Sequence, residues 1–375
     1  MAKTATPERA AATSSAPLPV APSKVRTLNL LTPTFGVSDG YGNSAEQMAI
    51  ALERAGLNVT ISGTARQAGF LNAPEIHDRQ HVMGEAIVFY SQPQLWSAQH
   101  SGSRRPIGFT MYESDEIPAE WIPRLIVADE IWVPSTWNVD VIGRHTKRPV
   151  YHVPLGVDAK AFFPTKRVRG EKLRILFFST YASEVRKGLD LAREAFSAAF
   201  PGREDVEFVV RSSFPCDVRA QLGDEFDVRS CSQPRSRMDV GQLTTASLAA
   251  YYRTFDALLY PSRGEGFGLI PLEVMATGMP AIFTAATGMY DYADLGMPVE
   301  ARSVPALVGS GRGGDAQQPR GRWFEPSLEQ LVDRLRQLDT DYDAVQAQAM
   351  RDAAKIAKVW TWDRTAQTII GRLEA

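Results

Sequence analysis

Short apolar runs alternate with amphipathic stretches along the chain from Val25 onward. This alternation is typical of parallel sheets that are covered by helices. The predicted strands of the first half are Val25–Leu31, Asn58–Ser62, Ala86–Tyr90, Pro106–Thr110, Glu130–Val133 and Val150–Val153. A helix is predicted from Ala45 to Ala55, because its apolar residues recur on one face.

A second series of the same kind follows a charged stretch, Lys166–Arg174, which predicts an exposed connection and hinge between two domains. Its strands are predicted at Leu173–Phe178, Val206–Val210, Ala257–Tyr260 and Ala281–Thr284, and its clearest helices at Gly188–Phe200 and Leu248–Thr254. We see no internal repeat. The pattern therefore predicts an α/β protein of two doubly wound domains, which bind a ligand in the cleft at the carboxyl ends of their strands.

Composition narrows the class of ligand. A chain of 375 residues with 44% hydrophobic content can bury two cores, and a formal net charge of -2 argues against a dedicated nucleic-acid binder. Two cysteines, Cys216 and Cys231, offer no disulfide framework and suit a reducing compartment. No segment has the apolar length of a membrane span. We therefore expect a small-molecule ligand and a cytoplasmic protein.

Residues 1–24 are rich in Ala, Thr, Ser and Pro and predict a disordered tail. A transit peptide fits their low acidity, but the tail has few basic residues and lacks an apolar face.

The strongest local signal runs from Tyr260 to Pro280 and contains two glutamates, Glu265 and Glu273. The pattern predicts a strand end, a glycine-containing loop and a helix start, with Glu265 in the loop and Glu273 in the helix. A loop that feeds a helix N-terminus presents backbone N–H groups to hydroxyls or a phosphate. The candidate donors are those of Phe267, Gly268 and Leu269, while Gly266 and Gly268 allow a ligand to approach the backbone.

This segment closely resembles the donor-sugar signature of the retaining family 4 glycosyltransferases. The resemblance implies the GT-B fold, in which two Rossmann-like domains face a central cleft. It also implies that Glu265 orients the hydroxyls of the donor sugar and that Glu273 binds the ribose. Taken alone, each glutamate favours a structural role, Glu265 as a solvated loop residue and Glu273 as a partner of the helix dipole.

The resemblance also suggests how the chain divides into domains. Residues 25–165 form the predicted acceptor domain, and residues 170–358 form the nucleotide-sugar domain. Residues 360–375 include the stretch Trp362–Leu373, which resembles the family's helix that crosses back to the first domain. Periodicity alone fits an ordinary closing helix equally well.

A glycine-rich loop, Thr32–Ser44, leads from the first strand into the first helix and presents free N–H groups to anions. In the family, the matching loop lies against the donor diphosphate and the acceptor. This assigns donor contacts to Gly36, Gly40, Tyr41 and Gly42, although the dinucleotide-binding spacing fails and a mere turn remains open.

Arg186 and Lys187 precede a helix and resemble the diphosphate clamp of the family. An arginine that many members carry about two turns earlier is absent here, and Arg186 or Arg211 is the expected substitute. An exposed, solvated pair is the alternative for Arg186 and Lys187.

Many members also place a histidine after a strand of the first domain, where this chain has the acidic residues Glu113, Asp115 and Glu116. A bacterial subset has a glutamate there and then a sequence like Asp129–Ser135, so the resemblance assigns the sugar-facing position to Glu113, with Asp115 and Glu116 as rivals. The three acids also suit compensation of a helix dipole.

No histidine spacing fits a metal site, and Asp339, Asp341 and Asp343 read as a connection between helices. No metal or cofactor is therefore expected, only a nucleoside diphosphate sugar as co-substrate.

The resemblance implies retaining, metal-independent glycosyl transfer to a glycan, lipid-linked, protein or other hydroxyl acceptor. Small basic groups such as Arg104–Arg105 leave peripheral contact with the inner face of a membrane open. The alternatives are a non-catalytic nucleotide-sugar binding module and a sugar-nucleotide epimerase of similar fold. Loops such as Gln233–Leu243 are expected to select the donor.

Overall fold

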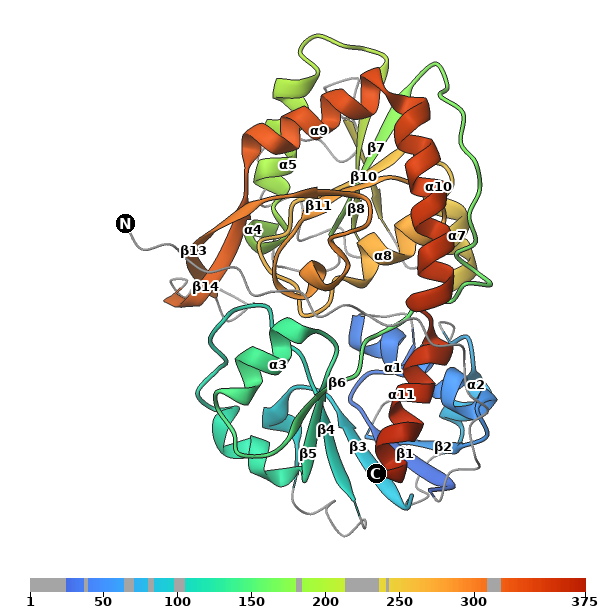
Figure 1. Cartoon of the computed structure of the whole chain (residues 1–375), viewed down its shortest axis with the longest axis vertical. Coiled ribbons are helices and arrows are strands. Elements are labelled where there is room, and N and C mark those ends of the chain that lie inside the picture. Colours follow the sequence, from blue (N-terminus) through green and yellow to red (C-terminus); the bar gives the residue numbers. More distant parts are fainter. Residues whose placement is uncertain are drawn as a thin grey trace.

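The computed structural model describes residues 25–36, 40–63, 71–79, 84–97, 105–179, 184–212, 236–240, 243–308 and 318–375. These residues form two α/β halves, one above the other in Figure 1. The tail, Cys216 and Cys231 lie outside the described residues, as do residues 233–235 and 241–242 of the stretch Gln233–Leu243.

The first half contains a parallel sheet of six strands in the order β2-β1-β3-β4-β5-β6. Its strands are β1 (Thr27–Leu31), β2 (Asn58–Ser62), β3 (Ala86–Tyr90), β4 (Pro106–Phe109), β5 (Glu130–Val133) and β6 (Val150–His152). The central strand β3 is buried along its whole length, as expected for a parallel sheet covered on both faces. The helical segments of this half are α1 (Gly40–Arg54), α2 (Pro74–His77), η1 (Pro93–Leu95), η3 (Ile122–Val127) and α3 (Thr136–Gly143).

The second half repeats this plan with the order β12-β11-β10-β7-β8-β9, again all parallel. Its strands are β7 (Leu173–Ser179), β8 (Val206–Ser212), β9 (Ser236–Val240), β10 (Ala257–Tyr260), β11 (Ala281–Thr284) and β12 (Met297–Val299). Its helical segments are α4 (Glu184–Lys187), α5 (Leu189–Ala199), α7 (Thr245–Tyr252), α8 (Leu269–Ala276), η4 (Thr287–Tyr292), α9 (Leu328–Thr340) and α10 (Tyr342–Val359). The predicted fold class is therefore confirmed.

The structure adds elements that the pattern did not predict. β9 and β12 are the two edge strands of the second sheet, where a full apolar run is not required. β9 lies inside the stretch that we expected to be a loop. An antiparallel hairpin, β13 (Ala301–Val308) with β14 (Gln318–Pro326), extends from the second half beside the junction of the halves (Figure 1).

Two further expectations need correction. Helix α1 begins at Gly40, not at Ala45, so Gly40, Tyr41 and Gly42 form its first turn. The charged connection is not exposed throughout, because Arg167 is buried. Its guanidinium donates to the Phe255 and Thr277 carbonyls, at 2.9 Å each.

The final helix α11 (Trp362–Glu374) returns to the first half and lies beside α1 (Figure 1). The end of α11 is fixed to the first half by the Arg105 guanidinium, which donates to the carbonyls of Arg372 and Leu373 at 2.8 and 2.9 Å. The chain passes between the halves a second time at Val157, whose N–H donates to the Trp360 carbonyl at 2.9 Å. The exact domain boundaries stay a prediction.

Candidate functional site

Glu265 is the centre of a buried polar cluster at the carboxyl end of β10. Its Oε1 accepts hydrogen bonds from the Lys187 ammonium at 2.7 Å, the Ser262 hydroxyl at 2.6 Å and the Tyr260 hydroxyl at 3.0 Å. Lys187 also donates to the Tyr260 hydroxyl at 2.7 Å. An ammonium carries three hydrogens, so Lys187 has one more to donate to a ligand.

The charged groups of this cluster shift one another's pKa values. Burial opposes ionisation of Glu265, but Lys187 and Arg186 outweigh it and lower the pKa of the carboxyl group. Burial lowers the pKa of Lys187, and Glu265 opposes that effect. For Arg186, burial is outweighed by Glu113 and Glu265, so its pKa is raised. The cluster therefore contains one carboxylate between two cations.

Arg186 connects this cluster to the first half of the molecule. Its Nη1 lies 3.5 Å from Glu265 Oε1, and its Nη2 lies 3.8 Å from Glu113 Oε1. Among the three acidic candidates, Asp115 instead accepts from the Arg322 N–H at 2.6 Å, on the hairpin. The geometry thus favours Glu113 over Asp115 as the carboxylate that faces Lys187 and Arg186.

Glu273 lies on α8, as predicted, and only 5% of it is exposed. Burial raises the pKa of its carboxyl group to about 8, although the neighbouring Tyr252 and Asn43 side chains oppose the shift. Asn43 belongs to α1, so this position also lies where the two halves meet.

The loop between the two glutamates is held by contacts with Tyr292 and Trp360. Gly268 has a φ of 85° and is the N-cap of α8. Its carbonyl accepts from the Tyr292 hydroxyl at 2.6 Å. The Phe267 ring packs against Tyr292 and Trp360. The loop that brings Phe267, Gly268 and Leu269 to the helix start is therefore firmly anchored.

The glycine-rich segment of the first half approaches the same region. The Gly36 N–H donates to the Gly42 carbonyl in the first turn of α1 at 3.0 Å. The Tyr41 hydroxyl accepts from the Met111 N–H at 3.3 Å, two residues before Glu113. The space that glycine leaves at Gly266 is filled by Met111, whose Cβ would lie 2.7 Å from an added methyl group.

Arg211 lies at the end of β8 and is buried. Its guanidinium stands 5.3 Å from the centre of the Tyr251 ring. Burial raises the pKa of the neighbouring Tyr252, and Arg211 opposes that shift. Arg211 is thus placed near the Glu273 position.

Sequence reasoning missed Arg263, which ties the loop to its surroundings. Its guanidinium binds Asp190 at 2.7 and 2.9 Å and Glu325 at 3.1 Å. Its N–H donates to the Arg186 carbonyl at 2.7 Å. An arginine two residues before Glu265 was visible in the sequence, but its partners lie far away along the chain.

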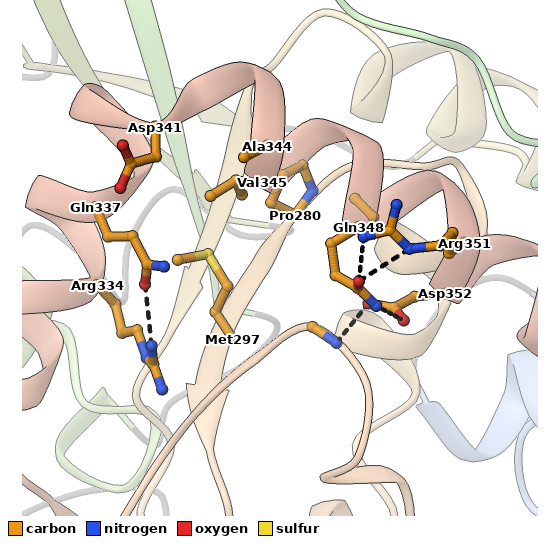
Figure 2. Close-up of a pocket in the computed structure, with 12 residues that line it drawn as sticks. Pro280, Met297, Arg334, Gln337, Asp341, Ala344, Val345, Gln348, Arg351 and Asp352 are labelled. Atoms are coloured by element: carbon orange, nitrogen blue, oxygen red, sulfur yellow. Dashed lines mark hydrogen bonds between the residues drawn. The ribbon is translucent and has the colours of Figure 1, made fainter.

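Two cavities lie away from this cluster. One of about 370 Å³ is lined by α9, α10 and the strand beginnings at Pro280 and Met297 (Figure 2). Asp352 in its wall accepts from Gln348 and from the Gly296 N–H. Another, of about 810 Å³, adjoins Arg167 and the beginning of β7. Both lie at the amino ends of strands, opposite the edge where open α/β sheets bind ligands.

Within the described residues, no group of three or more His, Cys, Asp or Glu side chains is arranged to hold a metal ion. Asp339 lies in the last turn of α9 and is paired with Arg169 and Arg203. Of the three aspartates in the predicted connection, Asp341 lies between α9 and α10, and Asp343 lies in the first turn of α10. Among the described helices, none is both long and apolar enough to cross a bilayer.

Two mannosyltransferases are similar in sequence to part of this chain. A GDP-mannose-dependent alpha-mannosyltransferase of Corynebacterium glutamicum is 26% identical over 189 residues, or 48% of this chain and 41% of the relative. The lipopolysaccharide core biosynthesis mannosyltransferase LpsB of Rhizobium meliloti is 31% identical over 142 residues, or 34% and 38%. The chain thus spans about two fifths of the length of these curated relatives.

Solved structures cover nearly all of the chain at low identity. Sucrose-phosphate synthase of Thermosynechococcus elongatus has a TM-score of 0.64 at 17% identity and covers 93% of this chain and 98% of its own. Anabaena Alr3699/HepE in complex with UDP and glucose has a TM-score of 0.66 at 14% identity and covers 93% and 99%. These similarities establish the GT-B fold.

A family model settles the family. The model described as "Family 4 Glycosyltransferase in conflict systems" matches residues 137–369, more than half of the chain. This stretch contains Lys187, Glu265 and Glu273. The chain therefore belongs to the family 4 glycosyltransferases of conflict systems.

Proposed function

We propose that the protein transfers a glycosyl unit from a nucleoside diphosphate sugar to a hydroxyl acceptor, with retention of configuration and without a metal ion. The observation that carries this proposal is the buried cluster of Lys187, Arg186 and Glu265 beside the N-terminus of α8. Two fixed cations at this position can stabilise the diphosphate as it leaves.

The surroundings of each residue indicate its role in the proposed reaction. Lys187 and Arg186 meet the diphosphate, the ionised Glu265 accepts hydrogen bonds from sugar hydroxyls, and Glu273 accepts those of the ribose. Glu113 faces the reacting sugar from the first half. In a front-face reaction, the acceptor oxygen forms the new bond as the diphosphate departs on the same side. The departing phosphate oxygen takes the acceptor proton, so no enzyme nucleophile is needed.

Donor turnover is the decisive test. Purified protein is incubated with UDP-, GDP-, ADP- and dTDP-sugars in the presence of EDTA, and nucleotide release is measured with and without hydroxyl acceptors. We expect release from one donor, and about a hundredfold lower release for Glu265→Gln. Glu171→Gln, at an exposed glutamate of the connection, is the control and should match the wild type.

Nucleotide binding without turnover under any of these conditions would overturn catalysis and favour the binding module. Conversion of the donor into an epimeric sugar would favour the epimerase. Complete loss of turnover in EDTA, restored by a divalent ion, would contradict metal independence.

Donor affinity is expected to depend on pH through Glu273, whose pKa is about 8 without ligand. Ribose hydroxyls bind the ionised form, so affinity should rise by up to about tenfold per pH unit below pH 8 and level off above it. Isothermal titration calorimetry in buffers of different ionisation enthalpy measures the proton released. For Glu273→Gln we expect a flat pH profile, and an equally steep profile in this variant would refute the assignment.

The same group makes folding pH-dependent, with a defined sign. Because its folded-state pKa is raised, the stabilisation is complete below the unfolded value near 4.5 and is lost as the pH rises through about 8. Glu273→Gln should therefore gain stability relative to the wild type above pH 8. Thermal unfolding at pH 6 and pH 9 measures this difference.

A further inference from the structure

We propose that Asn138 is a positioning residue that holds the Glu113 segment and the Glu265 loop in register across the junction of the two halves. This inference rests on the proposed function for its effect on turnover, but not for the contacts themselves. Asn138 lies in the first turn of α3, after the Asp129–Ser135 stretch, and it is completely buried.

Both the Oδ1 and the Nδ2 of Asn138 form hydrogen bonds, one with each half of the molecule. Its Oδ1 accepts from the Tyr112 N–H at 2.6 Å, in the first half. Its Nδ2 donates to the Gly266 carbonyl at 2.8 Å, in the second half, and to the Ser135 hydroxyl at 2.9 Å. Ser135 donates to the same Gly266 carbonyl at 2.8 Å.

These contacts lead directly to the two candidate carboxylates. Tyr112 precedes Glu113, and Gly266 follows Glu265, so one amide group joins the backbones that carry them. The two backbones that Asn138 connects are closely packed, because a methyl group added to Gly264 would collide with the Glu113 carbonyl. A shift between the two backbones would therefore change the spacing of Glu113, Arg186 and Glu265.

Asparagine suits this position for a chemical reason. The Tyr112 N–H needs an acceptor and the Gly266 carbonyl needs a donor at the same buried position. A primary amide supplies both without a charge. Aspartate has nearly the same shape, but it would place a second acceptor against the Gly266 carbonyl. A buried hydrogen bond would be replaced by repulsion at the same point.

The first test compares Asn138→Asp with the wild type by hydrogen exchange. We expect at least tenfold faster exchange of backbone amides in residues 262–268 and 111–116 of the variant. Asn29→Asp is the matched control, because Asn29 is a buried amide of the same half that binds Thr60 and Ser62 within the sheet. It should leave exchange in residues 262–268 unchanged.

The second test measures nucleotide release at varied donor concentration. Asn138→Asp should lower kcat by about thirtyfold to a hundredfold, while KM for the donor changes less than threefold. The split is expected because the proposed donor contacts lie mostly in the second half and remain, while the geometry for reaction is lost. Should Asn138→Asp fail to fold, Ser135→Ala removes one of the two bonds to Gly266 and should lower kcat threefold to tenfold.

The outcomes separate this inference from the proposed function. Absence of turnover in the wild type would contradict the proposed glycosyl transfer, and the hydrogen-exchange experiment would still test the contacts of Asn138 with Tyr112 and Gly266. Wild-type exchange in residues 262–268 of folded Asn138→Asp would overturn the role of Asn138, as would an unchanged kcat in an active enzyme.

Discussion

Replacing Lys187 by methionine is expected to lower kcat for glycosyl transfer by about a thousandfold. The ammonium is buried, is fixed by Glu265 and Tyr260, and has one hydrogen left for the departing diphosphate. A preorganised cation in a water-poor site contributes about this much to the stabilisation of developing charge. Initial rates of nucleotide release at saturating donor measure the effect.

The same change alters the protonation of Glu265. Lys187 is the leading cause that counters burial and keeps the pKa of this carboxyl group low. Without it, we expect the pKa of Glu265 to rise, so that the residual activity of Lys187→Met increases towards higher pH. Lys172→Met, at an exposed lysine of the same half, is the control for loss of a positive charge. A Lys187→Met enzyme within threefold of the wild type would contradict the clamp.

Replacing Arg167 by methionine should lower the free energy of unfolding by about 3 kcal/mol. Arg167 donates to carbonyls that end two helices, those of Phe255 after α7 and Thr277 after α8, and to the Thr277 hydroxyl at 3.0 Å. Burial lowers the pKa of the guanidinium to about 10, so the group remains charged at neutral pH. Methionine fills similar space, but it removes the Arg167 donor from the Phe255 carbonyl and leaves the Thr277 carbonyl with the Thr165 N–H at 3.0 Å.

Urea unfolding followed by circular dichroism measures this loss. Arg169→Met is the matched control, because Arg169 lies two residues away and pairs with Asp339 near the surface. Such a pair contributes about 1 kcal/mol or less. Equal effects for the two variants would show that the carbonyls at Arg167 find water as an adequate partner.

The sequence predicted best where several local signals agree. From Ala257 to Ala276, an apolar run, a Pro-Ser-Arg-Gly loop and a helix start point to one arrangement, and β10 and α8 lie as predicted. The beginning of α1 was misplaced because glycine and tyrosine are weak helix formers. Tertiary contacts hold this turn, among them Tyr90, whose hydroxyl donates to Ser44 at 2.7 Å.

The hairpin β13–β14 was missed for a related reason. Its strands contain Pro305 and Gly321, which argue against strands when only local sequence is considered. The middle of β14 contacts the first half, where the Asp115 carboxylate accepts from the Arg322 N–H. A contact between residues 207 positions apart leaves no local signal in a single sequence.

The sequence by itself determined the two parallel sheets and the family, and it indicated the residues that we propose to bind a nucleotide sugar, because all of these depend on local patterns of apolar residues, glycine and charge. Only the tertiary structure decided which charges meet. Lys187 and Glu265 are 78 positions apart, and Asn138 and Gly266 are 128 apart. Such pairs form because parallel strands bring their carboxyl ends to one edge, and because the two halves then close on each other. Neither step can be read from the neighbours of a residue along the chain.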